Sequence, residues 1–142
     1  MKFYNRKNEL SELGNLYNQS KQQGRMSVLT GRRRVGKTML AREFASKHKH
    51  IYFFVSKKSE QLLCDEFLQQ IKANFEIPVI GQINSFREIF KLLLELSLKE
   101  RFTLIIDEFQ EFYNINPSIF SDVQQYWDRY KQNSKLNLIF IG

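Results

Sequence analysis

The apolar positions along this chain form two patterns: stripes with the spacing of a helix, and short runs typical of strands. The stripes recur every three or four residues, as on one face of an amphipathic helix. They predict helices at residues 10–17, 37–48, 59–75, 85–99 and 117–130. The largely apolar runs at 102–106 and 136–141 are typical of strands that are covered on both faces. Two shorter strands are predicted at 26–30 and 51–55.

Strands that alternate with helices predict an α/β fold. Such a chain builds a parallel sheet through right-handed crossovers, with helices on both faces. The 142 residues are enough for one domain with a sizeable core, and no repeat or Pro/Gly-rich linker divides them, so residues 1–142 are expected to form a single unit. Asn116 is expected to cap the last helix, with Pro117 as the first helical residue.

The composition is that of an ordinary globular protein, with 42% hydrophobic and 26% charged residues, and it argues against the disordered and fibrous classes. The one cysteine, Cys64, cannot form an intramolecular disulfide, and Met1 is not followed by an apolar signal-peptide run. A reducing, cytoplasmic location is therefore expected. No apolar stretch approaches the ~20 residues that span a bilayer, so membrane insertion is not expected.

The chain is basic, with a net charge of +7 and a pI near 9.6. A charge of this sign favours polyanionic partners, and it fits a nucleic acid and the triphosphate of a nucleotide equally well. Five basic residues fall within thirteen positions: Arg25, Arg32, Arg33, Arg34 and Lys37. Because the same segment holds a phosphate-binding motif, much of the excess charge is expected to serve the nucleotide.

That motif is the segment 31–38, Gly-Arg-Arg-Arg-Val-Gly-Lys-Thr, which matches the phosphate-loop pattern G-x-x-x-x-G-K-[ST] and lies between a predicted strand and a predicted helix. Gly31 and Gly36 let the backbone turn tightly and approach an anion. Lys37 is expected to reach the β- and γ-phosphates of ATP, and the Thr38 hydroxyl to be a ligand of Mg²⁺. The amides expected to converge on the phosphates are those of Arg34, Val35, Gly36, Lys37, Thr38 and Met39.

A second motif follows the phosphate loop by about seventy residues, where the apolar run at 102–106 ends in two adjacent acids, Asp107 and Glu108. A buried strand of a parallel sheet delivers such side chains to the crevice where ligands of open α/β sheets bind. Asp107 is expected to hold the Mg²⁺ ion, and Glu108 to orient or deprotonate the attacking water. An acidic pair after an apolar strand is a weak signal alone, and a phosphate loop earlier in the chain strengthens it.

With these two motifs the chain resembles the P-loop ATPases that have an additional strand and a catalytic glutamate, the group that includes the AAA+ and STAND proteins. Residues 31–38, together with Ile-Asp-Glu-Phe-Gln at 106–110, look most like the archaeal-type ATPase family. Residues 3–10, Phe-Tyr-Asn-Arg-Lys-Asn-Glu-Leu, are similar to that family's N-terminal box, with Asn5 where a glycine is often seen. The resemblance implies the strand order 1-4-3-2, and it places Asn5 and Arg6 near the adenine.

The resemblance runs to Gly142, where the family's fourth strand normally leads to a polar sensor residue, a fifth strand and a small helical lid. The chain is therefore interpreted as the N-terminal part of an ATPase domain, with the fifth strand missing and the strand at 26–30 left as an open edge. Sensor and arginine-finger residues are not assigned on this interpretation. Nucleic-acid or protein partners, and any oligomer, would be reached through residues beyond Gly142.

The leading functional hypothesis is an enzyme that hydrolyses ATP with Mg²⁺ to drive a conformational switch, and the chain alone is expected to bind ATP or ADP better than it turns ATP over. The alternatives are a nucleic-acid-binding module with ATP dependence and a small-molecule P-loop kinase. A kinase needs an acceptor pocket and a lid, and the acids at 107–108 favour water activation instead. A GTPase is disfavoured because no Asn-Lys-x-Asp guanine signature occurs. The pair His48 and His50 lacks further metal ligands at a useful spacing.

Overall fold

The computed structural model describes residues 6–29, 34–78 and 81–142, and in them helices and strands alternate as the sequence pattern predicts. The strands are β1 (Arg25–Leu29), β2 (His50–Phe54), β3 (Phe102–Asp107) and β4 (Leu136–Ile141). The helices are α1 (Arg6–Gln19), α2 (Arg34–Ala45), α3 (Glu60–Asn74), α4 (Phe86–Ser97), the short α5 (Phe112–Ile115), which a 3₁₀ turn (Phe109–Glu111) precedes, and α6 (Ser118–Tyr130). None of the described helices is long and apolar enough to cross a membrane.

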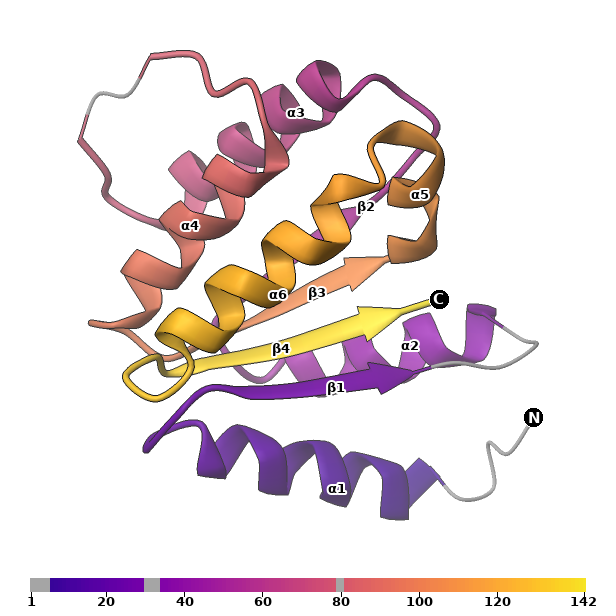
Figure 1. Cartoon of the computed structure of the whole chain (residues 1–142). Helices are drawn as coiled ribbons and strands as arrows, with labels where there is room; N and C mark the ends of the chain where they lie inside the picture. The colour runs from indigo at the N-terminus through magenta and orange to yellow at the C-terminus, as the bar shows by residue number, and fades with distance from the viewer. Residues whose placement is uncertain (1–5, 30–33, 79–80) are drawn as a thin grey trace.

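The four strands form one parallel sheet in the order β1-β4-β3-β2, which confirms the order 1-4-3-2 that the resemblance implies. Figure 1 shows the arrowheads of β1, β3 and β4 pointing toward the same edge of the sheet. We call this edge, where the strands end, the carboxyl edge, and the opposite one, where they begin, the amino edge. Because the strands are parallel, each connection from a strand to a helix starts at the carboxyl edge, and each connection from a helix to a strand finishes at the amino edge.

Helices cover both faces of the sheet, which makes a three-layer α/β fold (Figure 1). On one face, α1 and α2 pack on the sheet through an apolar cluster that includes Leu40 and Ile105. On the other face, α3, α4 and α6 bury a larger cluster that includes Phe90, Leu104 and Trp127. Every residue of the central strands β3 and β4 is buried, as predicted for strands covered on both faces.

None of the predicted helices begins at the predicted residue, and the difference is largest for α1, which begins at Arg6 instead of residue 10, and for α2. α2 begins at Arg34, three residues before Lys37, so that the end of the phosphate-loop motif forms its first turn. The predicted start lies too far along the chain because Gly36 lowers the helix propensity of this segment. In the folded protein the tertiary context overrides this low propensity. α6 begins at Ser118, one residue after Pro117, and the Asn116 side chain still caps it: its Oδ1 accepts a hydrogen bond from the Ser118 amide at 3.2 Å.

β1 is an edge strand of the sheet that the structure describes. Within the described residues β4 is its one neighbour, and Val28 has 51% of its surface exposed. This agrees with the open edge predicted for the strand at 26–30, of which Thr30 lies outside the described residues. The backbone groups on the outer side of β1 are therefore available to pair with another strand.

Gly24, in the turn between α1 and β1, tests how tightly this part of the fold is packed. A Cβ at this position would lie 2.7 Å from Trp127 Cη2 and 3.2 Å from the Lys131 carbonyl oxygen. Gly24→Ala is therefore expected to lower the free energy of unfolding by about 1–3 kcal/mol, as overpacking of a tight core does. Gly14→Ala is the matched control within α1, because a Cβ there meets no described residue within 4 Å, and it should raise this free energy by about 0.5–1 kcal/mol. Urea denaturation measures both changes, and equal stabilities of the two variants would contradict the packing.

Candidate active site

The two predicted motifs meet at the carboxyl edge of the sheet. α2 follows β1 and carries the end of the phosphate-loop motif in its first turns, and Asp107 is the last residue of the central strand β3. Lys37 exposes 6% of its surface, and Asp107 is fully buried. Lysine and aspartate are rarely buried unless they have polar or charged partners, so their burial at one end of the sheet indicates a polar functional site.

The pleat of β3 turns Asp107 toward α2. Side chains two residues apart in a strand share a face of the sheet, and Ile105 packs in the cluster beneath α2. Asp107 therefore faces the same helix, and the Thr38 hydroxyl donates a hydrogen bond to Asp107 Oδ2 at 2.9 Å. The fold thus brings together two predicted site residues that are 69 positions apart in the chain.

Tyr52 is a third member of this site, and no sequence motif singles it out. It pairs with Ile105 in the register of β2 on β3, and its hydroxyl donates a hydrogen bond to the same Oδ2 of Asp107. The guanidinium carbon of Arg42, on α2, lies 4.4 Å from the centre of the Tyr52 ring. Burial, followed by the hydrogen bond to Asp107 and the charge of that carboxylate, raises the pKa of the Tyr52 hydroxyl well above its ordinary value, so Tyr52 remains a donor at neutral pH.

The two oxygens of the Asp107 carboxylate have different surroundings. Oδ2 accepts both hydrogen bonds, whereas Oδ1 is buried and has no hydrogen-bond partner among the described residues. A buried acceptor without a donor is costly, and hard oxygen ligands such as a carboxylate and the Thr38 hydroxyl are those that Mg²⁺ prefers. No three His, Cys, Asp or Glu side chains in the described part of the chain could hold a metal ion together. The residues present therefore fit a Mg²⁺ ion that shares its ligands with bound phosphates, as this ion usually does.

Glu108 follows Asp107 and adopts an unusual backbone conformation. Its φ of 59° and ψ of 38° are left-handed, and it is the one non-glycine residue with positive φ in the described part of the chain. A non-glycine residue in this region costs about 1–3 kcal/mol, and such strain is concentrated at functional sites. The partly exposed side chain accepts a hydrogen bond from Gln110 Nε2 to its Oε1 at 3.1 Å. Glu108 therefore lies at the carboxyl edge, beside Asp107, with one oxygen oriented by a neighbour.

The other predicted contacts are described in part. Two predicted residues lie outside the described residues: Asn5 and Gly31. The structure describes the backbone alone of three more: Arg6, at the start of α1, and Arg34 and Val35, at the start of α2. Gly36 is buried in the first turn of α2, whereas Met39 is 52% exposed.

Arg25 does not lie with the phosphate loop, although it is close to it in sequence. It is the first residue of β1 and therefore lies at the amino edge, whereas the loop follows the end of β1 at the carboxyl edge. A five-residue strand separates these edges by about 13 Å along the chain, at roughly 3.3 Å per residue. The expectation that much of the charge in this segment serves a nucleotide therefore does not extend to Arg25, while Arg32 and Arg33 lie outside the described residues.

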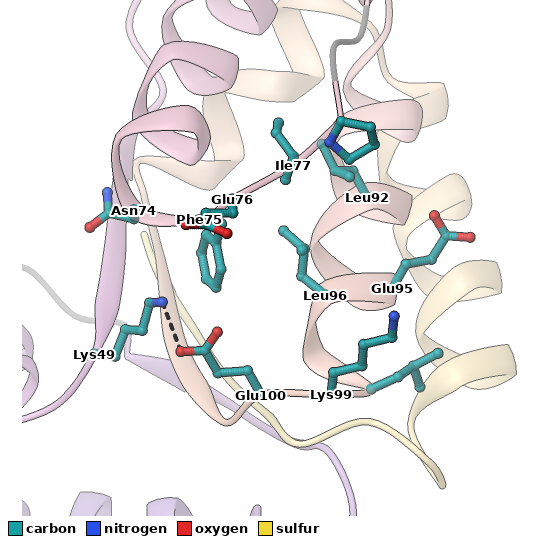
Figure 2. A pocket seen from close by; sticks show the side chains of 12 residues that line it. Lys49, Asn74, Phe75, Glu76, Ile77, Leu92, Glu95, Leu96, Lys99 and Glu100 are labelled. Atoms are coloured by element: carbon teal, nitrogen blue, oxygen red, sulfur yellow. Dashed lines mark ion pairs between the residues drawn. The ribbon is translucent and has the colours of Figure 1, made fainter.

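A separate cavity lies toward the amino edge (Figure 2). Its volume is about 710 Å³, and Phe75, Leu92 and Leu96 supply apolar walls from the end of α3 and from α4. At its margin the Lys49 Nζ lies 2.7 Å from Glu100 Oε2. No residue of the phosphate-loop motif or of the acidic pair lines this cavity, so it is not part of the candidate active site.

Comparison with known proteins identifies relatives of the whole described fold. Residues 3–142 match the family model described as an ATPase domain predominantly from Archaea. Over 115 residues the chain is 28% identical to an uncharacterized protein of Methanocaldococcus jannaschii, in an alignment that covers 81% of this chain and 24% of that protein.

The solved structures that are similar to this chain include two archaeal proteins. A Walker-type ATPase of Pyrococcus abyssi superimposes with a TM-score of 0.61 at 20% identity, over 92% of this chain and 44% of that one. The Cdc6p protein of Pyrobaculum aerophilum superimposes with a TM-score of 0.59 at 16% identity, over 96% of this chain and 38% of that one. At these identities the likeness shows the shared fold. The chain spans about a quarter of the length of the curated relative and less than half of either solved chain.

Tyr52→Phe tests whether the tyrosine hydroxyl holds Asp107. The change is expected to lower the free energy of unfolding by about 1–3 kcal/mol, because it removes one of two donors from a buried oxygen while the ring keeps its packing. Tyr113→Phe is the matched control, since Tyr113 is 67% exposed, and it should change stability by less than about 0.5 kcal/mol. Urea denaturation of the nucleotide-free protein at neutral pH compares the two. Equal losses would mean that the Tyr52 hydroxyl contributes nothing to holding Asp107.

Proposed function

We propose that this chain, which belongs to the family of ATPase domains found predominantly in Archaea, binds ATP together with Mg²⁺ and takes part in ATP hydrolysis. The observation that carries the proposal is the hydrogen bond from Thr38, on the phosphate-loop helix, to Asp107, at the end of β3. This hydrogen bond connects the start of a helix, which can bind phosphate, to an acidic residue, which can bind a cation, at the carboxyl edge. Ligands of open parallel sheets bind at this edge.

The start of α2 is the proposed phosphate site. The first four N–H groups of a helix have no partner inside it, and the helix dipole places partial positive charge at the same end. In α2 these groups belong to the end of the phosphate-loop motif. Lys37 adds a full positive charge from a buried position and would interact with the β- and γ-phosphates. Gly31 and Gly36 would keep side chains away from the approaching anion.

Thr38 and Asp107 would hold the Mg²⁺ ion, one through its hydroxyl and the other through its carboxylate. By donating its proton to Asp107, the Thr38 hydroxyl leaves its lone pairs available to a cation. Tyr52 donates to the same carboxylate oxygen, which leaves Oδ1 directed to other partners. Bound in this position, Mg²⁺ would neutralise part of the charge of the phosphates.

Glu108 is the proposed water-activating residue. A carboxylate next to the cation site can orient a water molecule and accept its proton as the water attacks the γ-phosphate. The left-handed backbone of Glu108 supports this role, because such strain persists where the surrounding structure enforces it and is found mainly at functional sites. The hydrogen bond from Gln110 holds one of its oxygens and limits the rotation of the carboxylate.

Hydrolysis is further proposed to drive a conformational switch in the whole protein. α2 is the element best placed to transmit it, because its first turn would contact the phosphates and its last turn leads to the amino edge. The chain spans 24% of its curated relative and 44% and 38% of the two solved chains. The moving parts, the protein or nucleic-acid partners and any oligomer are therefore proposals about the whole protein.

Lys37→Ala tests the phosphate site. ATP or ADP with Mg²⁺ is expected to raise the melting temperature of the parent chain, since ligand at a hundredfold its dissociation constant adds ~2.7 kcal/mol of stability. The substitution should remove most of this shift, because it deletes the charge that faces the phosphates. Lys57→Ala is the matched control: Lys57 is exposed and follows β2 at the same edge, and its loss should leave the shift unchanged. An equal nucleotide-induced shift in both variants would refute the assignment.

Glu108→Gln tests the hydrolytic step separately from binding. The amide keeps the shape of the side chain but cannot accept the proton of the water, so in the whole protein nucleotide affinity should persist while hydrolysis falls by about 10²–10⁴-fold. Asp107→Asn should instead weaken the dependence of binding on Mg²⁺. Glu111→Gln, in the neighbouring 3₁₀ turn, serves as the control and should hydrolyse ATP at the parent rate. Parallel measurements of phosphate release and nucleotide binding decide the matter; parent-rate hydrolysis by the Glu108 variant would place water activation elsewhere.

A further inference from the structure

A group of positive charges lies at the amino edge of the sheet, away from the candidate active site. Four connections lead from a helix into a strand: residues 20–25, 46–49, 98–101 and 131–135, the first counted with the opening residue of β1. Each of them carries two Lys or Arg residues: Lys21 and Arg25, Lys47 and Lys49, Lys99 and Arg101, Lys131 and Lys135. We call these eight residues the basic edge.

The four connections, eight cations and Glu100 together, carry a charge equal to the net charge of the whole chain. Glu100 is the one acidic residue in the four connections. The sequence has 22 Lys and Arg against 15 Asp and Glu, of which eight and one lie here, so fourteen of each remain elsewhere and cancel. The net charge of +7 therefore equals the charge of the four connections, which lie at the end of the sheet opposite to the proposed phosphate site.

The order of the strands sets the four connections side by side. Because the sheet runs β1-β4-β3-β2, the pairs of cations follow one another as those of 20–25, 131–135, 98–101 and 46–49. Figure 1 shows the starts of β1, β4 and β3 next to one another at this edge. Adjacent strands lie about 4.8 Å apart, so the four strand starts span about 14 Å. Each connection thus places two cationic residues along this edge.

Most of these cations lack an acidic partner in the described part of the chain. Lys49 pairs with Glu100 at 2.7 Å, and Lys131 lies 3.5 Å from Asp128. The other six residues of the basic edge form no ion pair with a described residue. Surface charges that the protein leaves uncompensated raise the local potential and attract anions.

The two arginines of the basic edge, Arg25 and Arg101, are partly buried. Arg25 Nε and Arg101 Nη1 are buried, and neither has a hydrogen-bond partner among the described residues. The Arg101 guanidinium carbon lies 4.1 Å from the centre of the Tyr17 ring, so this arginine packs against an aromatic side chain of α1. The two arginines would therefore act on a bound polyanion through their charge, and not through hydrogen bonds from these buried nitrogens. Burial, followed by the charges of Arg101 and Lys47, lowers the pKa of the neighbouring His48.

We infer that the basic edge binds the sugar–phosphate backbone of a nucleic acid. Duplex DNA carries one negative charge per about 1.7 Å of its axis, so a row of about 14 Å lies against several phosphates. Lysine and arginine side chains on short connections supply charge without an element that reads base edges, so the binding is independent of base sequence. The inference uses no residue of the active site and stands apart from the proposed function.

An anionic membrane is the less suitable partner for this surface. Proteins that lie on membranes combine basic residues with an apolar face that inserts between the lipids. Among the described residues of the four connections, Leu98 is the one large apolar side chain that is exposed, at 38%. The exposed side chains of the four connections are therefore mainly polar or charged, as expected for contacts with a phosphate backbone.

The test measures how binding depends on salt. A fluorescently labelled duplex of about 20 base pairs and arbitrary sequence is titrated with the chain from about 50 to 200 mM salt, and anisotropy gives the affinity. Each phosphate contact contributes about −0.9 to the slope of log K against log salt concentration. Lys21→Gln, Lys47→Gln and Lys99→Gln together remove three exposed cations without an ion pair in the described structure, so the slope should become shallower by about 2.7.

A triple variant of equal charge separates the edge from the net charge. This control combines Lys57→Gln, after β2, with Arg87→Gln and Lys91→Gln, on α4. Because the three positions are away from the basic edge, the control should leave the salt slope unchanged. If the first triple variant failed to fold, Lys99→Gln alone should reduce the slope by about 0.9.

Three results would overturn the inference. The first is a parental slope in the basic-edge variant, and the second is an equal change in both triple variants. The third is binding to phosphatidylserine vesicles or to polyglutamate that equals or exceeds binding to the duplex at the same salt concentration, which would assign the surface to a lipid or an acidic protein.

Discussion

The structure depends on the carboxylate of Asp107, which is buried at the end of the central strand. A charged group inside the fold is tolerated only if other groups donate to it. Thr38 of α2 and Tyr52 of β2 both donate to its Oδ2, so that satisfying this one oxygen ties a helix and a neighbouring strand to β3. The same two bonds fix the start of the phosphate-loop helix against the acid. The same two hydrogen bonds to Asp107 therefore stabilise the fold and set the geometry of the candidate site.

A parallel sheet separates the chemistry of the molecule into two ends. All strands end at the carboxyl edge, where Asp107 and Glu108 lie beside the start of α2, and all begin at the amino edge, where the eight cations of the basic edge lie. α2 runs from one to the other, since Ala45 at its end leads directly to Lys47 and Lys49. The proposed nucleotide and the inferred polyanion would thus bind at opposite ends of one helix. Such a helix can couple two sites when it moves as a rigid element between two positions.

Sequence reasoning reached the parts of this structure that depend on local pattern. The apolar stripes and runs predicted every major helix and strand. The two motifs assigned Thr38 and Asp107 to one Mg²⁺ ion, which stays a prediction, and the fold places these two residues in contact. Tyr52 could not be predicted in the same way, because its role depends on the register of β2 on β3 and no local pattern reveals that register. The order of the strands came from the resemblance to a family rather than from periodicity, since helical crossovers allow several orders.

The position of Arg25 could not be predicted for a similar reason. Arg25 is close to the phosphate loop in sequence, but strand β1 lies between them. Counting basic residues within a short stretch of sequence does not show that an extended strand holds its two ends far apart. The left-handed backbone of Glu108 was also beyond prediction, because glutamate has no intrinsic preference for that region and the surrounding fold imposes it. Features that depend on packing between segments distant in sequence can be identified only from the structure.

The most direct test of the proposed site is a crystal structure of the protein with Mg²⁺ and a non-hydrolysable ATP analogue. The account predicts that the triphosphate lies at the start of α2 with its β- and γ-phosphates at Lys37, and that the metal ion lies between the phosphates, the Thr38 hydroxyl and Asp107. A nucleotide bound away from α2, for example in the cavity beside Phe75, or a metal ion remote from Asp107, would contradict it.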